Sequence, residues 1–164
     1  MLSKFKRSKH QQHLAQLPKL PQTVADVRTL YAPSDFRTTL LDAIANATQR
    51  IYLVALYLEH DDAGREILNA LYQAKQRRPE LEICVLVDWH RAQRGRIGAA
   101  AANTNADWYC AMAGQHPEQS VPIYGVPVNT REALGVLHLK GFVVDDTVIY
   151  SGASINDVYL HQHE

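Results

Sequence analysis

Two short apolar runs separated by an amphipathic segment constrain the fold of this chain more than any other feature of its sequence. Residues 51–58 and 81–87 are almost wholly apolar, which is typical of strands buried on both faces. Between them, Asp61 and Asp62 can begin a helix that ends at Arg77-Arg78-Pro79 and has the apolar stripe Ile67, Leu68, Leu71 and Ala74. A strand, a helix and a strand within about forty residues form a βαβ unit, and its crossover predicts a parallel sheet.

Further helices and strands are expected around this unit. Ser34 or Asp35 can cap a helix whose apolar face is Phe36, Leu40, Leu41 and Ile44. We expect a helix over 99–115 with an interruption near 103–105, and strands over 121–126, 136–144 and 148–151. Asp145-Asp146 would join the last two strands as a hairpin. The fold class predicted is α/β, with a mixed, largely parallel sheet flanked by helices.

The amino-terminal stretch differs in composition from the rest of the chain. Residues 1–33 hold three of the seven prolines, and we interpret them as a basic leader that precedes a single domain over 34–164. Before Asp26 the leader has no acidic residue and five cations, which are Lys4, Lys6, Arg7, Lys9 and Lys19. With the apolar Leu2, Phe5, Leu14 and Leu17, this composition fits either a peripheral anchor on an anionic membrane surface or a solvated tail.

Charge, cysteine content and motif searches narrow the function classes. The 17 basic and 17 acidic residues balance, so no global field favours nucleic acid, and we expect no specific nucleic-acid partner. Cys84 and Cys110 are too few for a disulfide framework, no metal-ligand spacing is supported, and no dinucleotide or P-loop motif occurs. The longest apolar run is too short to span a membrane. We therefore expect a cytoplasmic protein without metal or cofactor, peripherally associated with the inner face of the membrane.

The segment His138-Leu-Lys140-Gly-Phe-Val-Val-Asp145 is the candidate catalytic motif. If it is a strand, His138 and Lys140 share a face roughly 7 Å apart, so one phosphate can touch both. A neutral imidazole is a competent nucleophile, and a lysine stabilises the charge that gathers on phosphate oxygens. Ser154 and Asn156 can add neutral donors, whereas Asp145 would face away from His138 and is expected to play a supporting role.

Three arginines follow the second apolar run. Arg91, Arg94 and Arg96 lie just past the expected carboxyl end of a parallel strand, where ligands of open α/β sheets bind. They can hold a pyrophosphate or lipid headgroups, or form an ordinary solvated surface. Tyr57 and Glu59 alternate in phase at the end of the first run and can line the same cleft, although Tyr57 also fits the core.

The motif H-x-K-x4-D with a trailing G-x-S-x-N resembles the signature of the phospholipase D superfamily. Within it, the chain is similar to the amino-terminal half of the bacterial CDP-diacylglycerol–serine O-phosphatidyltransferases. That resemblance extends over the whole chain and includes Val87–Gly98, Asn103–Tyr109 and Ser151–His161. In the phospholipase D superfamily the signature more often reads Gly-Ser-x-Asn, without the extra residue seen here.

The resemblance implies phosphatidyl transfer from CDP-diacylglycerol to L-serine through a phosphohistidine, without metal. Family members carry two H-x-K motifs, and this sequence has one, so a second motif-bearing half is implied as a partner. That half is either a carboxyl-terminal half or a second copy of the chain. The alternatives are a single-motif phosphodiesterase or nuclease acting as a homodimer, and a non-catalytic module that binds lipid or phosphate.

Overall fold

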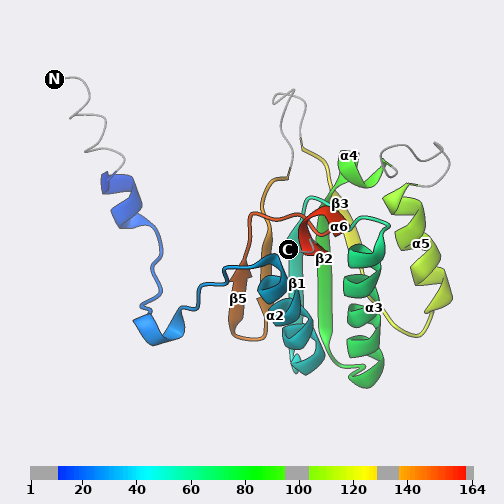
Figure 1. Cartoon of the computed structure of the whole chain (residues 1–164), viewed down its shortest axis with the longest axis horizontal. Helices are drawn as coiled ribbons and strands as arrows, with labels where there is room; N and C mark the ends of the chain where they lie inside the picture. Colours follow the sequence, from blue (N-terminus) through cyan, green and yellow to red (C-terminus); the bar gives the residue numbers. More distant parts are fainter. Residues whose placement is uncertain (1–10, 95–103, 129–136, 162–164) are drawn as a thin grey trace.

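The computed structural model describes residues 11–94, 104–128 and 137–161 (Figure 1). Its strands are β1 (Arg50–Ala55), β2 (Glu82–Asp88), β3 (Ile123–Val126), β4 (Gly141–Val144) and β5 (Thr147–Tyr150). Its helices are α2 (Pro33–Asn46), α3 (Asp62–Arg77), α4 (Trp89–Ala92), α5 (Asn105–Gln115) and α6 (Asp157–Leu160). A short 3₁₀ helix, η1 (Val24–Asp26), precedes them, and residues 11–16 are also helical.

The described strands form one sheet in the order β3-β2-β1-β4-β5. Strands β1, β2 and β3 are parallel neighbours, and α3 makes the crossover between the first two, as the βαβ pattern predicts. Strand β4 runs antiparallel to β1, and β4 and β5 form the expected hairpin. The mixed α/β fold is confirmed, with the parallel pairings confined to β1, β2 and β3.

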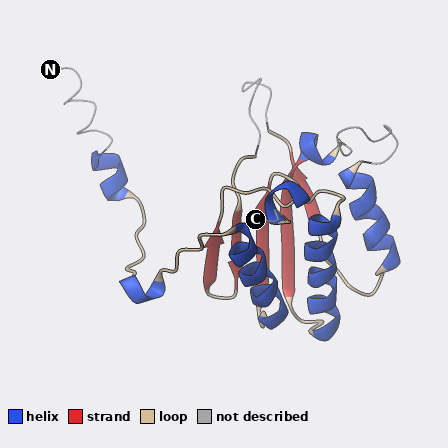
Figure 2. Ribbon diagram, in the orientation of Figure 1, coloured by secondary structure: helices blue, strands red, loops and turns tan. Residues whose placement is uncertain are grey.

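Helices α2 and α3 pack side by side on one face of this sheet (Figure 2). The core between them includes Leu40 and Ile44 of α2, Ile67 and Leu71 of α3, and the β1 residue Leu53, all fully buried. These side chains recur at the helical and strand periods from which the elements were predicted. The apolar stripes therefore fix the face of each helix that the sheet covers.

The other face of the sheet differs from the sequence expectation. Strand β1 was predicted to be buried on both faces, yet its burial alternates along Arg50–Ala55. Its open-face residues Tyr52 and Val54 are only half-buried, and on β5 Val148 and Tyr150 are more than 70% exposed. The apolar run misled the prediction because the open-face side chains are apolar as well.

Several element boundaries also differ from the prediction, among them the start of β3 at Ile123 instead of residue 121. Helix α2 begins at Pro33, with Ala32 as its N-cap, because proline suits the first helical position, whose N–H needs no intrahelical partner. Strand β1 ends at Ala55 instead of residue 58. Strand β4 begins at Gly141, so the described residues 137–140 lie outside any strand. The expected helix start at 99 and strand start at 136 fall outside the described residues.

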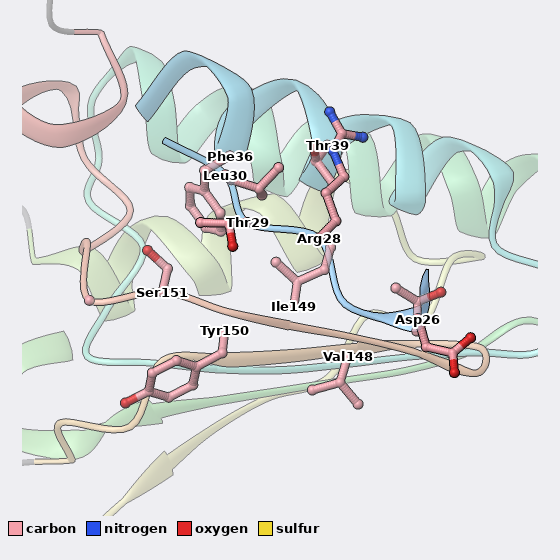
Figure 3. Close-up of a pocket in the computed structure, with 12 residues that line it drawn as sticks. Asp26, Arg28, Thr29, Leu30, Phe36, Thr39, Val148, Ile149, Tyr150 and Ser151 are labelled. Atoms are coloured by element: carbon pink, nitrogen blue, oxygen red, sulfur yellow. The ribbon is translucent and has the colours of Figure 1, made fainter. Parts of the chain in front are cut away.

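A groove separates the end of the leader from the edge strand β5. Asp26 and residues 28–30 line one side of a cavity of about 640 Å³, and β5 with Ser151 and Gly152 lines the other. Figure 3 shows Ile149 pointing toward Leu30 and Phe36, whereas Val148 and Tyr150 point to the opposite face. Leu30 packs against the core although it lies within the stretch that we assigned to the leader.

The β4–β5 turn is tied to the start of β1 by Asp145. Its carboxylate accepts hydrogen bonds from the backbone N–H groups of Thr48, Gln49 and Arg50 and from the Thr48 hydroxyl, at 2.8–3.0 Å. These bonds, that of Arg50 above all, hold the pKa of Asp145 well below its usual range. Asp145 also has φ 49°, a conformation that aspartate tolerates in tight turns.

We expect Asp145→Asn to lower the free energy of unfolding at pH 7 by about 2 kcal/mol, because it removes charge-assisted hydrogen bonds while tolerating the same φ. The folded-state pKa is depressed, so this stabilisation is complete above the unfolded pKa of about 4 and is lost progressively as the pH falls from there through the lowered folded-state pKa. Urea unfolding of both proteins from pH 7 to pH 2 measures the difference.

Asp146→Asn is the control: Asp146 is exposed and pairs only with Arg50 in the described structure, so little change is expected. An Asp145→Asn deficit that did not shrink in acid would contradict this account.

Candidate active site at the carboxyl edge of the sheet

The sheet topology brings the motif segments to one edge. The parallel strands β1 and β2 end there, and the antiparallel β4 begins there because Gly141 pairs with Val54. Strand β5 ends at the same edge, where Tyr150 pairs with Gly141. The residues after β1, after β2, before β4 and after β5 therefore meet, at the edge where open α/β sheets bind their ligands.

His138 and Lys140 lie at this edge, in the segment that leads into β4. The prediction that they share one face of a strand is wrong, because β4 begins only at Gly141, and the pairing of Gly141 with Val54 is the last between β4 and β1. His138 is exposed, whereas Lys140 is 6% exposed. The Lys140 ammonium donates to the backbone carbonyl of His138 at 3.3 Å. The lysine is thus held beside the histidine by its side chain and not by strand alternation.

Ser154 and Asn156 follow β5 and are both buried. Beyond the end of β1 the chain resumes pairing, since Leu58 forms a parallel bridge with Ile155 and the Glu59 N–H donates to the Ile155 carbonyl at 3.1 Å. Ser154 and Asn156 thus flank Ile155, which the segment after β1 holds in place. The last pair between β1 and β4 is Val54 with Gly141, and beyond it the chain pairs with a residue that follows β5.

Asn156 has a structural role in addition to its position in the motif. Its side-chain carbonyl accepts from the Tyr159 N–H at 3.2 Å and caps α6, while its side-chain NH₂ donates to the Tyr57 hydroxyl at 3.3 Å. Tyr57, which we interpreted as either core or cleft, is half-buried and reaches the motif. Hydrogen bonds to both the oxygen and the NH₂ group therefore fix the orientation of the Asn156 side-chain amide.

Tyr109 is a residue of this region that sequence reasoning did not single out. Its buried hydroxyl accepts from the Leu58 N–H at 2.9 Å and donates to the Leu58 carbonyl at 2.6 Å. Burial raises the pKa of Tyr109, so the hydroxyl keeps its proton. Through Tyr109, helix α5 thereby holds Leu58, which pairs with Ile155 beyond the end of β1. No spacing signal marks Tyr109, because its partner is a backbone group about fifty residues away in sequence.

Asp61 and Asp157 join the N-terminus of α3 to the N-terminus of α6. Asp61 caps α3 by accepting from the Gly64 N–H at 2.9 Å, and its second oxygen accepts from the Asp157 N–H at 2.7 Å. Asp157 in turn accepts from the Ala63 N–H at 2.8 Å. This reciprocal capping confirms Asp61 as a helix start and fixes the chain directly after Asn156.

The predicted arginines are placed unequally. Arg91 lies in α4, directly after β2, and is half-buried, and Arg94 follows α4 and is exposed. Arg96 lies outside the described residues. Asp145 is at the opposite end of β4 from Lys140, about 16 Å away along an extended chain. The structure therefore brings together His138, Lys140, Ser154, Asn156 and Arg91, and keeps Asp145 apart as a support of the turn.

A mixed sheet that gathers an H-x-K segment and a Ser/Asn turn at one edge defines a phospholipase D-like half-domain. The family model described as "Cardiolipin synthase, PLD-like domain" matches residues 40–157. The chain belongs to this phospholipase D-like family.

Two curated relatives are similar over the whole chain. The chain is 74% identical to the amino-terminal part of "CDP-diacylglycerol--serine O-phosphatidyltransferase PssA" of Escherichia coli, covering 100% of this chain and 36% of that protein. It is 50% identical to the CDP-diacylglycerol–serine O-phosphatidyltransferase of Haemophilus influenzae, again over 100% of this chain and 36% of the relative. The chain thus spans little more than a third of the length of these relatives.

Solved structures support the fold. The crystal structure of phosphatidylserine synthase from Haemophilus influenzae matches with a TM-score of 0.84 and 50% identity, over 97% of this chain and 35% of that one. NucT from Helicobacter pylori matches with a TM-score of 0.55 and 15% identity, over 78% of this chain and 72% of that one. The second similarity concerns the fold alone.

Proposed function

We propose that this chain supplies one half of the active site of a CDP-diacylglycerol–serine O-phosphatidyltransferase, which makes phosphatidylserine and CMP. The observation that carries the proposal is the 74% identity over all 164 residues to an enzyme of that name. The geometry of the sheet edge also supports the proposal, because transfer of a phosphoryl group needs a nucleophile and an anion site together. The side chains that meet at this edge are His138, Lys140, Ser154 and Asn156.

His138 is the proposed nucleophile. Its imidazole attacks the phosphorus that bears the diacylglycerol, an N–P bond forms, and the bond to CMP breaks. The serine hydroxyl then attacks the same phosphorus and frees the histidine. His138 suits this role because it is exposed at the sheet edge while its backbone is contacted by Lys140.

The other side chains divide between charge stabilisation and binding. Lys140 is proposed to neutralise charge on the non-bridging oxygens, and the Ser154 hydroxyl and the Asn156 amide to donate to the same phosphate. Arg91, Arg94 and Arg96 are proposed to hold the pyrophosphate or headgroup side of the substrate. Asp145 supports the hairpin that carries the motif and does not touch the reacting atoms in this scheme.

A complete site needs a second motif-bearing half. The leaving CMP oxygen requires a proton or a counter-charge, and the sequence has no second H-x-K group to provide it. The relatives are nearly three times as long as this chain, which leaves ample length for a second half. The proposed partner is therefore the remaining part of such a protein or, in its absence, a second copy of this chain.

The function is tested by giving the intact enzyme, one that carries this chain with its second half, two substrates in parallel. With CDP-diacylglycerol and L-serine we expect CMP release and phosphatidylserine, and with plasmid DNA no nicking. Nicked DNA without CMP release would identify the nuclease alternative. Binding of CDP-diacylglycerol without turnover of either substrate would identify a non-catalytic binding module.

The leader is proposed to attach the protein peripherally to the inner face of the membrane. Among the residues that the structure describes, no helix combines the length and apolar character needed to cross a bilayer. Leu14, Leu17 and Leu20 are each more than 45% exposed, so they are available to a surface. A cationic stretch with exposed leucines binds anionic lipid, with about 1 kcal/mol from each cation near the membrane.

We expect deletion of residues 1–20 to abolish sedimentation of the protein with vesicles that contain anionic lipid at low ionic strength. Binding by the intact leader should weaken as salt is added, because its Lys and Arg contributions are screened. Neutral phosphatidylcholine vesicles serve as the control and should bind neither protein. If the deletion variant sedimented as well as the full chain did, the leader would be a solvated tail.

A further inference from the structure

The segment that carries His138 has little support from the sheet. Residues 137–140 precede β4, so they have no ladder of strand hydrogen bonds. Within the described residues, the Lys140 side chain contacts the His138 carbonyl, and the Lys140 carbonyl accepts from the Ser151 N–H at 3.2 Å. Directly before the histidine, the Leu137 N–H donates to a carboxylate oxygen of Asp88 at 2.9 Å.

Asp88 connects three segments at this edge of the sheet. It is the last residue of β2 and is only 1% exposed. Its second carboxylate oxygen accepts from the Arg91 N–H at 2.8 Å and caps α4. Its own N–H donates to the Leu56 carbonyl at 3.2 Å, just past the end of β1. The end of β1, the start of α4 and the residue before His138 are therefore all held by Asp88.

This arrangement restricts movement of the motif segment. A buried carboxylate is costly unless both of its oxygens are hydrogen-bonded. Displacement of Leu137 would leave one Asp88 oxygen buried without its donor, at a penalty of about 1–3 kcal/mol or more for a charged group. The hydrogen bond thus favours one position of the Leu137 backbone, and His138 is the next residue.

We propose that Asp88 is a positioning residue for the reaction, one that sets the direction of His138 through the Leu137 N–H. The inference rests on the proposed role of His138 as nucleophile. Attack on phosphorus needs alignment of the imidazole with the bond that breaks, and a displacement of about 1 Å in such a group can reduce the rate by about 10²-fold. Asp88 touches no substrate in this account.

The test is Asp88→Asn in the intact enzyme. The substituted side chain has the same shape but accepts through one oxygen only, so either Leu137 or Arg91 loses its acceptor. We expect kcat to fall about 10²-fold, because loss of the Leu137 hydrogen bond lets His138 leave its alignment with the bond that breaks. In ¹H–¹⁵N spectra the Leu137 amide resonance should move, reporting the lost hydrogen bond independently of activity.

Thr104→Ala is the matched control for loss of a helix cap. Thr104 caps α5 by accepting from the Asp107 N–H at 3.0 Å and makes no hydrogen bond to the described motif residues. We expect it to lower the melting temperature while leaving kcat and the Leu137 resonance unchanged.

A His138→Asn variant measured alongside separates the two proposals: if it stays active, the nucleophile assignment fails. If His138→Asn is inactive and Asp88→Asn retains wild-type kcat, the positioning role of Asp88 is overturned.

Discussion

His138→Asn is expected to abolish phosphatidyl transfer by the intact enzyme, lowering kcat by about 10⁴-fold or more. Removing a nucleophile closes the covalent route, and what remains is the rate enhancement from binding and charge stabilisation alone. Asparagine keeps a polar side chain of moderate size at an exposed position, so the fold should be unaffected. CMP release from CDP-diacylglycerol in the presence of L-serine measures the effect.

The control for this variant is His116→Asn. His116 lies at the carboxyl end of α5, stacked on Tyr72, and its described contacts do not include the motif segment. We expect near-wild-type turnover from it and an unchanged melting temperature for His138→Asn. Turnover by His138→Asn at the wild-type level would require another residue to be the nucleophile.

The isolated 164-residue chain is expected to turn over CDP-diacylglycerol at least about 10²–10⁴-fold more slowly than an enzyme with both halves, because general acid assistance to the leaving CMP is missing. Loss of substrate positioning by the absent half would slow it further. CMP release by the chain alone and by the intact enzyme, at equal concentrations of active chains, gives the ratio.

Self-association is the way in which the isolated chain can recover activity. The open face of the sheet leaves Tyr124, Val148 and Tyr150 exposed, and apolar surface of this kind favours association. A symmetric dimer that set two copies of His138 across one cleft would show turnover rising with concentration, in step with dimerisation measured by light scattering. A monomer with full, concentration-independent turnover would contradict the two-histidine scheme.

The local elements were predictable because their signals are local. The stripe of α3 and its cap at Asp61 lie within one stretch of sequence, and the two apolar runs around it identify the parallel pair β1 and β2. The hairpin at Asp145-Asp146 was predictable for the same reason. The resemblance of the H-x-K segment and the later Ser/Asn turn to one signature placed both in a single site.

The finer geometry of the site depends on contacts between distant segments, which one sequence does not reveal. Pairing between β1 and β4 ends at Val54, and Leu58 further along pairs with Ile155 instead. His138 and Lys140 therefore lie before the first residue of β4 and outside the strand. The anchoring of Leu137 by Asp88 and of Leu58 by Tyr109 likewise joins side chains to distant backbone groups. Backbone partners have no residue type that a motif search can detect.

The open face of the sheet was missed for a different reason. A strand that is apolar on both sides is read as buried on both sides. Here Tyr52, Val54 and Leu86 occupy the face that the described helices leave uncovered, so the pattern is accurate about side-chain type and wrong about burial in this chain.

The most direct test of the central claim is to identify the covalent intermediate. The intact enzyme is incubated, without L-serine, with CDP-diacylglycerol radiolabelled at the phosphorus that bears the diacylglycerol, then quenched in base and digested. The account predicts an acid-labile, base-stable label on the peptide that contains His138, released when L-serine is added before the quench. CMP release without any labelled peptide, or a stable label on another residue, would contradict it.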